Sequence, residues 1–314
     1  MYGLSAAKTL RKESFLLNRF FQQASRLTFD NTAFPLRGMK LLLGSSFILS
    51  LLCLGIPVLG ADLFVDKTLE AAVRQQVFTK RTSKEPLLAE DVKNVSTVKA
   101  SGGKIRSLKG LEACKALASL ELPENEIEDI SPLAGLERLQ LLDLSGNRIR
   151  NIGPVETLKA LQYLNLENNQ VEDLAPLAVL GNMRSLYLTE NRIRDPRPVA
   201  KLTKLWSLYL GKNQIEDISS IKNLVGISNL DFRSNKVSDL SPLSGMNQLR
   251  MVFMQGNQIK DLEPILKPVT KDASGERRFA PYLRLWLKGN PIAPDSSQVK
   301  ELAKVVREVN FDYE

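Results

Sequence analysis

The sequence predicts an α/β repeat solenoid, a curved right-handed coil with a parallel sheet on its concave side, short helical turns on its convex side and helical caps. The first observation is an asparagine that closes a nine-residue apolar phrase and recurs every 22 residues, as Asn125, Asn147, Asn169, Asn191, Asn213, Asn235 and Asn257, with Asn290 following after 33. The second is a turn of the type Asp-Ile-Ser-Pro-Leu that follows most of these asparagines. Both repeat in phase, which is the signature of stacked structural units.

Each apolar phrase predicts one short strand, as in Leu142-Asp143-Leu144. Because successive side chains of a strand point to opposite faces, both leucines face inward and the residue between them faces outward. One strand cannot bury its leucines alone, so successive coils must stack with their strands in parallel. We expect nine coils, counting a degenerate first copy at Val98 and a last copy at Leu285 and Leu287.

Two polar columns accompany the leucines. The asparagines are expected to satisfy backbone groups of neighbouring coils, a structural role. A second column has the spacing that a calcium site could use, but its members lie on separate coils and precede a proline or a short turn, so we interpret them as turn caps: Asp129, Asp173, Asp195, Asp217, Asp239 and Asp261. The sequence therefore predicts no metal site.

These seven copies of L-x-x-L-x-L-x-x-N resemble the 22-residue class of leucine-rich repeats found in bacterial internalins and in the repeat subunits that regulate protein phosphatase. The resemblance covers the chain from about Asp62 to its end. It implies a non-catalytic binding protein. The internalin side implies an extracytoplasmic module, and the phosphatase side implies a cytoplasmic protein-interaction scaffold as the alternative.

Both ends of the solenoid are expected to carry caps. Residues 62–95 form a helical N-terminal cap, in which Leu69, Val73 and Val77 share one face and Asp66 begins the helix. Residues 96–292 form the solenoid, interrupted near 267–282 by an insertion that we interpret as a charged loop, either a silent surface insertion or a binding element. Residues 293–314 form a capping helix whose apolar positions are Val299, Leu302, Val305 and Val306.

An apolar run at residues 41–59 follows Arg37 and Lys40 and precedes two small residues, which is the order of a secretory signal peptide. Residues 39–61 are therefore expected to be a signal peptide or an uncleaved signal anchor. Residues 1–38 are then a dispensable extension, with translation starting at Met39. The body is expected to be secreted, periplasmic or at the cell surface, and to touch the membrane only through residues 41–59.

Composition argues against several functions. Seven basic and two acidic residues precede Asp62, so most of the net charge of +8 is N-terminal and the body lacks a polyanion-binding field. The chain has no histidine, and it shows no phosphate-binding loop, nucleophile elbow or cluster of metal ligands. We therefore expect no nucleic-acid partner, no cofactor and no catalytic residues.

The outward positions of the strands are where a partner would bind. Along the solenoid these positions are first acidic, then aromatic and finally basic, and exposed aromatic and arginine side chains are typical of recognition surfaces. The alternative is that the rings only pack on each other across coils. A protein is the expected partner, with a glycan as the alternative, and the candidate residues are Tyr163, Tyr187, Trp206, Tyr209, Asp231, Arg233, Arg250, Phe253 and Trp286.

Overall fold

The computed structural model describes residues 62–312. The predicted extension at 1–38 and the predicted signal segment at 39–61 lie outside this range. Within the described residues, no helix combines the length and the apolar character needed to cross a bilayer.

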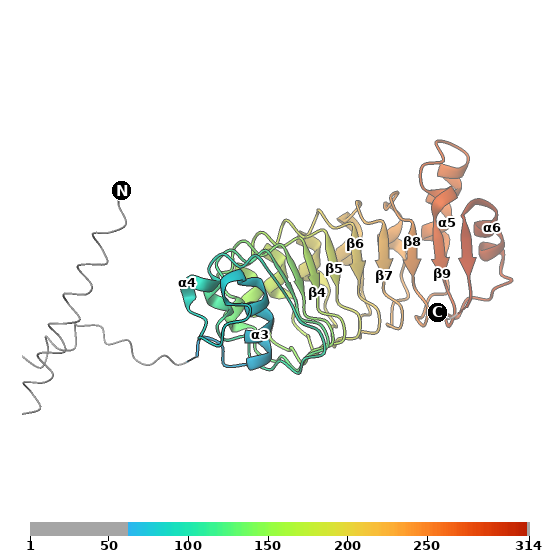
Figure 1. The fold of residues 1–314 in the computed structure, drawn as a ribbon. Helices are drawn as coiled ribbons and strands as arrows, with labels where there is room; N and C mark the ends of the chain where they lie inside the picture. Colours follow the sequence, from blue (N-terminus) through green and yellow to red (C-terminus); the bar gives the residue numbers. More distant parts are fainter. Residues whose placement is uncertain (1–61, 313–314) are drawn as a thin grey trace, which may run out of the picture. The chain divides into compact units, whose positions relative to one another are not determined.

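The described chain forms a single parallel sheet of ten strands that follow one another in sequence order (Figure 1). The register is the same along the whole sheet: the central residue of each strand pairs with the central residue of the next, as Leu120 with Leu142 and Leu142 with Leu164. The strands are β1 (Thr97–Lys99), β2 (Ser119–Glu121), β3 (Leu141–Asp143), β4 (Tyr163–Asn165), β5 (Ser185–Tyr187), β6 (Ser207–Tyr209), β7 (Asn229–Asp231), β8 (Met251–Phe253), β9 (Arg284–Trp286) and β10 (Glu308–Asn310). This confirms the predicted leucine-rich solenoid.

Short 3-10 turns return the chain on the side away from the sheet (Figure 1). They are η2 (Leu111–Ala113), η3 (Ser131–Leu133), η4 (Gly153–Thr157), η5 (Ala175–Val179), η6 (Arg197–Lys201), η7 (Ser219–Asn223), η8 (Ser241–Leu243) and η9 (Ala280–Tyr282). The aspartate column caps these turns: the Asp129 carboxylate accepts the Ser131 N–H at 2.8 Å, and the Asp217 carboxylate accepts that of Ser219 at 2.7 Å. The predicted turn-capping role is confirmed.

The asparagine column joins each coil to its neighbours. Asn147 Nδ2 donates to the carbonyl of Leu122 at 3.0 Å and to that of Leu144 at 2.9 Å, while its Oδ1 accepts the Ile127 N–H at 3.0 Å. The same three bonds recur at each asparagine of the column as far as Asn290. Buried amides therefore satisfy backbone groups that the tight turns would otherwise leave without partners.

A helical cap covers the first coil. Helix α3 (Lys67–Gln76) buries Leu69 and Val73 against the solenoid, and the Asp66 carboxylate caps it by accepting the N–H groups of Thr68 and Leu69. The turn η1 (Phe78–Lys80) and helix α4 (Ala89–Val92) complete this end. One continuous apolar core runs from Phe64 to Val306.

The C-terminal end departs from the sequence prediction in two places. The charged loop was expected near 267–282, but its first part is helical, because α5 (Glu263–Ala273) buries Ile265, Leu266 and Val269 and packs against α6 (Ser297–Val305). A charged connection remains at residues 274–279. The expected capping helix ends at Val305, and β10 then pairs with β9, placing Val309 opposite Leu285. The tenth strand lacks the asparagine phrase, so the repeat pattern did not indicate it.

Candidate functional site

The outward side chains of β1–β10, together with the residues just before and after these strands on the same side, form a surface that we call the strand face. Tyr163, Tyr187 and Tyr209 are half-buried on it at β4–β6. The rings of Tyr163 and Tyr187 are 5.2 Å apart between centroids, and those of Tyr187 and Tyr209 are stacked at 4.7 Å. Because β5 and β6 pair in register, the two stacked rings come from equivalent positions of neighbouring coils.

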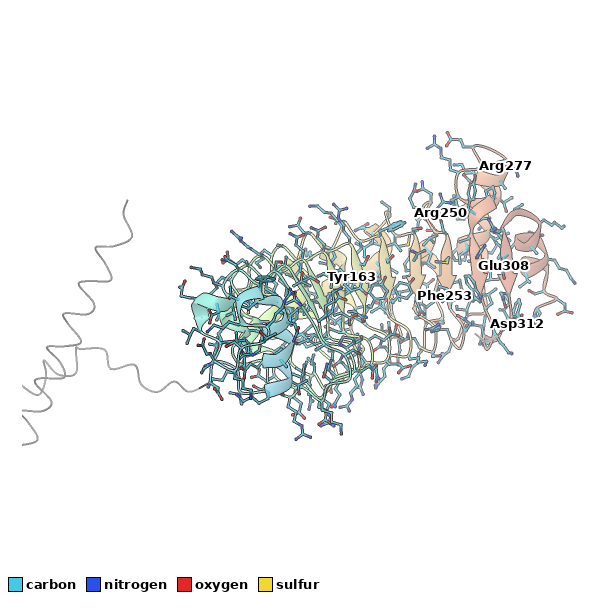
Figure 2. The ribbon with its side chains drawn as sticks, viewed as in Figure 1. Tyr163, Arg250, Phe253, Arg277, Glu308 and Asp312 are labelled. Atoms are coloured by element: carbon cyan, nitrogen blue, oxygen red, sulfur yellow. The ribbon has the colours of Figure 1, made fainter. Side chains whose placement is uncertain are left out.

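A second aromatic pair lies on β8 and β9, where Phe253 and Trp286 stack with their ring centroids 4.3 Å apart. Figure 2 labels Phe253 together with Tyr163 of the first group. Trp206 and Arg250 come one residue before β6 and β8, and both are exposed, Trp206 by 59%. The guanidinium of Arg250 lies over the ring of Tyr282, 4.8 Å from its centroid. The structure therefore brings the predicted aromatic residues together in two groups, one on each side of β7.

Asp231 departs from the prediction, because it is completely buried although it stands on the strand face between these groups. Its paired neighbours are Tyr209 on β6 and Phe253 on β8. A Cβ atom added at Gly211 would meet both carboxylate oxygens of Asp231, at 2.9 and 3.0 Å, and Arg233 Cγ at 3.0 Å. The missing side chain at Gly211 therefore leaves room in which the Asp231 carboxyl is sunk.

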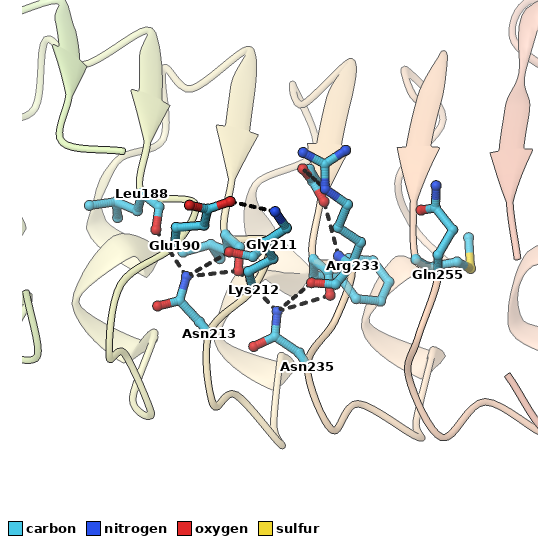
Figure 3. Close-up of polar contacts among 12 residues, drawn as sticks. Leu188, Glu190, Gly211, Lys212, Asn213, Arg233, Asn235 and Gln255 are labelled. Atoms are coloured by element: carbon cyan, nitrogen blue, oxygen red, sulfur yellow. Dashed lines mark hydrogen bonds and ion pairs between the residues drawn. The ribbon is translucent and has the colours of Figure 1, made fainter. Parts of the chain in front are cut away.

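Arg233 lies beside this carboxyl, with its Nε 3.4 Å from Asp231 Oδ2, while its own backbone N–H donates to Asp231 Oδ1 at 2.9 Å. Burial raises the pKa of Asp231 to about 6, although the Arg233 N–H and its guanidinium both act to lower it. Gly211, Arg233 and Gln255 occupy equivalent places on three successive coils (Figure 3). Sequence reasoning missed Gly211 and Gln255, although a glycine among bulkier residues in one repeat column was a usable signal.

Some charges of the strand face are paired with each other. Glu121 forms an ion pair with Lys99 at 2.9 Å, and Glu190 forms one with Lys212 (Figure 3). Glu167 is half-buried and has no ion-pair partner among the described residues; burial and the nearby Glu190 carboxylate raise its pKa. Burial and the charge of Asp143 raise the pKa of Tyr163 to about 12, so its phenol stays protonated.

Residues 62–312 hold no group of three or more acidic, cysteine or histidine side chains placed to bind a metal ion. Burial raises the pKa of the Cys114 thiol to about 12, so this thiol stays protonated. What the strand face offers is therefore stacked rings, a sunken carboxyl and paired charges.

Stacked parallel strands with an asparagine in the turn after each of β2–β9 define a leucine-rich-repeat protein. A family model described as "Leucine Rich repeats (2 copies)" matches residues 137–179. No curated protein sequence matches the chain significantly.

Solved structures extend the comparison. The chain is 33% identical to internalin C2 of Listeria monocytogenes, with a TM-score of 0.63, over 65% of this chain and 89% of that one. It is 29% identical to the internalin InlF of the same organism, with a TM-score of 0.64, over 81% and 78%. A leucine-rich-repeat protein of Leptospira interrogans shares the fold at 21% identity and a TM-score of 0.59, over 71% of this chain and 62% of that one. The chain belongs to the internalin-like family of bacterial leucine-rich-repeat proteins.

Proposed function

We propose that this protein is a non-catalytic, extracytoplasmic binding protein that recognises a protein partner through its strand face. Leucine-rich-repeat proteins generally serve as protein-interaction scaffolds rather than as enzymes, and this coarser role follows from the family. The observation that carries the finer proposal is a row of three half-buried rings in contact on the sheet, with Tyr163 tilted against Tyr187 and Tyr187 stacked on Tyr209.

Rings in this setting suit recognition energetically. Tyr and Trp lose little side-chain entropy on binding, and they contribute disproportionately to interfaces. The in-register pairing of β4, β5 and β6 holds the three tyrosines in place before any partner arrives. Trp206 and Trp286 extend the aromatic surface toward the C-terminal coils.

The experiment is affinity capture of partners by the immobilised protein, followed by measured affinity for each purified partner. We expect the variant Tyr187→Ala, Tyr209→Ala, Trp286→Ala to weaken binding by at least about 100-fold, as for residues at the centre of an interface. Phe78→Ala is the matched control, because Phe78 is 82% exposed but lies on the N-terminal cap. Equal affinity of the triple variant and the wild type would exclude the strand face.

Export is the second part of the proposal and rests on the apolar run at residues 41–59. N-terminal sequencing of the protein isolated from its cells tests it. A mature start near Asp62, or an intact chain held in the membrane fraction, supports export. An intact Met1 or Met39 start in the soluble cytosol would instead favour the cytoplasmic scaffold that the phosphatase-regulating relatives suggest.

A further inference from the structure

Three buried polar atoms without a hydrogen-bond partner lie on two adjacent coils of the strand face, Asp231 Oδ2 and Arg233 Nε on one and Gln255 Oε1 on the next. Four such atoms occur in residues 62–312: Ser220 Oγ, and then Asp231 Oδ2, Arg233 Nε and Gln255 Oε1, which belong to two successive coils. Buried polar groups in folded proteins are nearly always hydrogen-bonded, because leaving one unpaired costs about 1–3 kcal/mol. The clustering of three therefore needs a physical explanation.

Arg233 is the member of this cluster that can leave it. Its side chain is 31% exposed, whereas that of Asp231 is 1% exposed. The contact between Arg233 Nε and Asp231 Oδ2 is a 3.4 Å ion pair without a hydrogen bond, so little holds the guanidinium in place. Asp231 stays fixed when Arg233 turns away, because its Oδ1 accepts a backbone N–H rather than the guanidinium.

With the Arg233 side chain turned outward, the exposed atoms would be two acceptors, Asp231 Oδ2 and Gln255 Oε1. The paired neighbours Tyr209 and Phe253 flank them, and Tyr209 belongs to the tyrosine stack. The carboxylate of Glu167 has no ion-pair partner among the described residues. It lies close enough to Asp231 to raise the pKa of that carboxyl. Acceptors between aromatic faces favour a cation, and a planar guanidinium can both stack on the rings and bond the carboxylate.

We propose that Arg233 is a displaceable internal cation, and that the slot formed by Asp231 and Gln255 receives an arginine side chain of the protein partner. This inference rests on the proposed function and specifies the partner's chemistry: an arginine-bearing segment laid across β6–β8. Arg233 occupies the slot in the free protein, where its positive charge compensates the buried charge of the Asp231 carboxylate. The partner's arginine replaces it with better hydrogen-bond geometry.

The test titrates the full-length protein with the peptide acetyl-Gly-Arg-Gly-amide, and with the same peptide carrying citrulline, a neutral side chain of the same shape. Arg233→Ala should bind the arginine peptide about tenfold more tightly than the wild type, because the competing internal cation is gone. Lys236→Ala is the matched control: it also removes one positive charge, but Lys236 pairs with Glu216 at 3.0 Å after the strand has ended. It should bind as the wild type does.

The gain must depend on the carboxyl. Adding Asp231→Asn to Arg233→Ala should remove it, and the citrulline peptide should bind every variant at least about tenfold more weakly than arginine binds Arg233→Ala. Should Arg233→Ala fail to fold, Arg233→Gln removes the charge while keeping much of the side chain, and the same gain is expected. Unchanged or weaker binding by these variants, or equal binding of citrulline, overturns the inference. If the tyrosine and tryptophan variant still loses its purified partner in that case, the proposed function stands without it.

Discussion

The substitution Asp231→Asn should change how the stability of this protein depends on pH. Asp231 is completely buried, and burial raises the pKa of its carboxyl from 3.8 to about 6. The folded protein therefore holds this proton more tightly than the unfolded chain does. Between about pH 4 and pH 6 the folded state binds more protons than the unfolded state, so the wild type loses stability as the pH rises through this window and no more above it.

The size of the effect follows from the two pKa values. A difference of about two pH units at about 1.4 kcal/mol each corresponds to about 3 kcal/mol. The amide that replaces the carboxyl in the variant has no proton to lose, so this dependence disappears. The free energy of unfolding of the variant relative to the wild type should therefore rise by about 2.5 kcal/mol between about pH 4 and pH 7.5, because the unfolded carboxyl is already partly ionised at pH 4.

Urea unfolding of both proteins at several pH values measures this difference, and titration of all shared carboxyls cancels from it. Asp195→Asn is a control of opposite sign, because the hydrogen bonds of Arg197 lower the pKa of Asp195. The pH dependence of the free-energy difference between this control variant and the wild type should be small, because Asp195 and Arg197 are both well exposed. A difference between Asp231→Asn and wild type that stays constant with pH would refute the buried, ionisable carboxyl.

Two further predictions concern the architecture. Asn191→Ala removes the amide that donates to the carbonyls of Leu166 and Leu188 and accepts the Val171 N–H. In urea titrations this variant should lower the free energy of unfolding by at least about 2 kcal/mol. A loss below about 0.5 kcal/mol would contradict the structural role of the asparagine column. Gly211→Ala should destabilise the protein and perturb the titration of Asp231, since the new Cβ meets its carboxylate at 2.9 Å, whereas Gly181→Ala, with nothing within 4 Å, should not. Equal stability of the two alanine variants would show that Asp231 does not depend on the space above Gly211.

The repeat architecture could be predicted from sequence because its cause is local and repeated. Each asparagine sits at a fixed distance from the leucines that it accompanies, so the period fixes the strand, its inward residues and its register. Helix α5 and strand β10 escaped prediction because neither repeats. Val309 takes the place of a leucine beside Leu285 only after the chain has returned through α6.

The candidate site was predicted in part. Alternation correctly placed Tyr187, Tyr209, Asp231 and Phe253 on one side of the sheet. Alternation decides direction but not exposure, and Asp231 is hidden because Gly211, one coil earlier, provides no side chain to fill the space. Exposure therefore depended on a residue of the neighbouring coil, which a pattern within one repeat does not describe.

The asparagine column also determines what the loss or gain of one repeat would do to the solenoid. The side-chain amides of Asn147 and Asn169 bond only to their own coil and the one before it, so these bonds do not depend on the number of coils. Excising residues 148–169 would join Asn147 directly to Gln170, which follows Asn169 just as Arg148 follows Asn147, so the phase of the repeat would be kept. Loss or duplication of one unit would therefore shorten or lengthen the sheet by a single rung of about 4.8 Å, leaving the caps untouched.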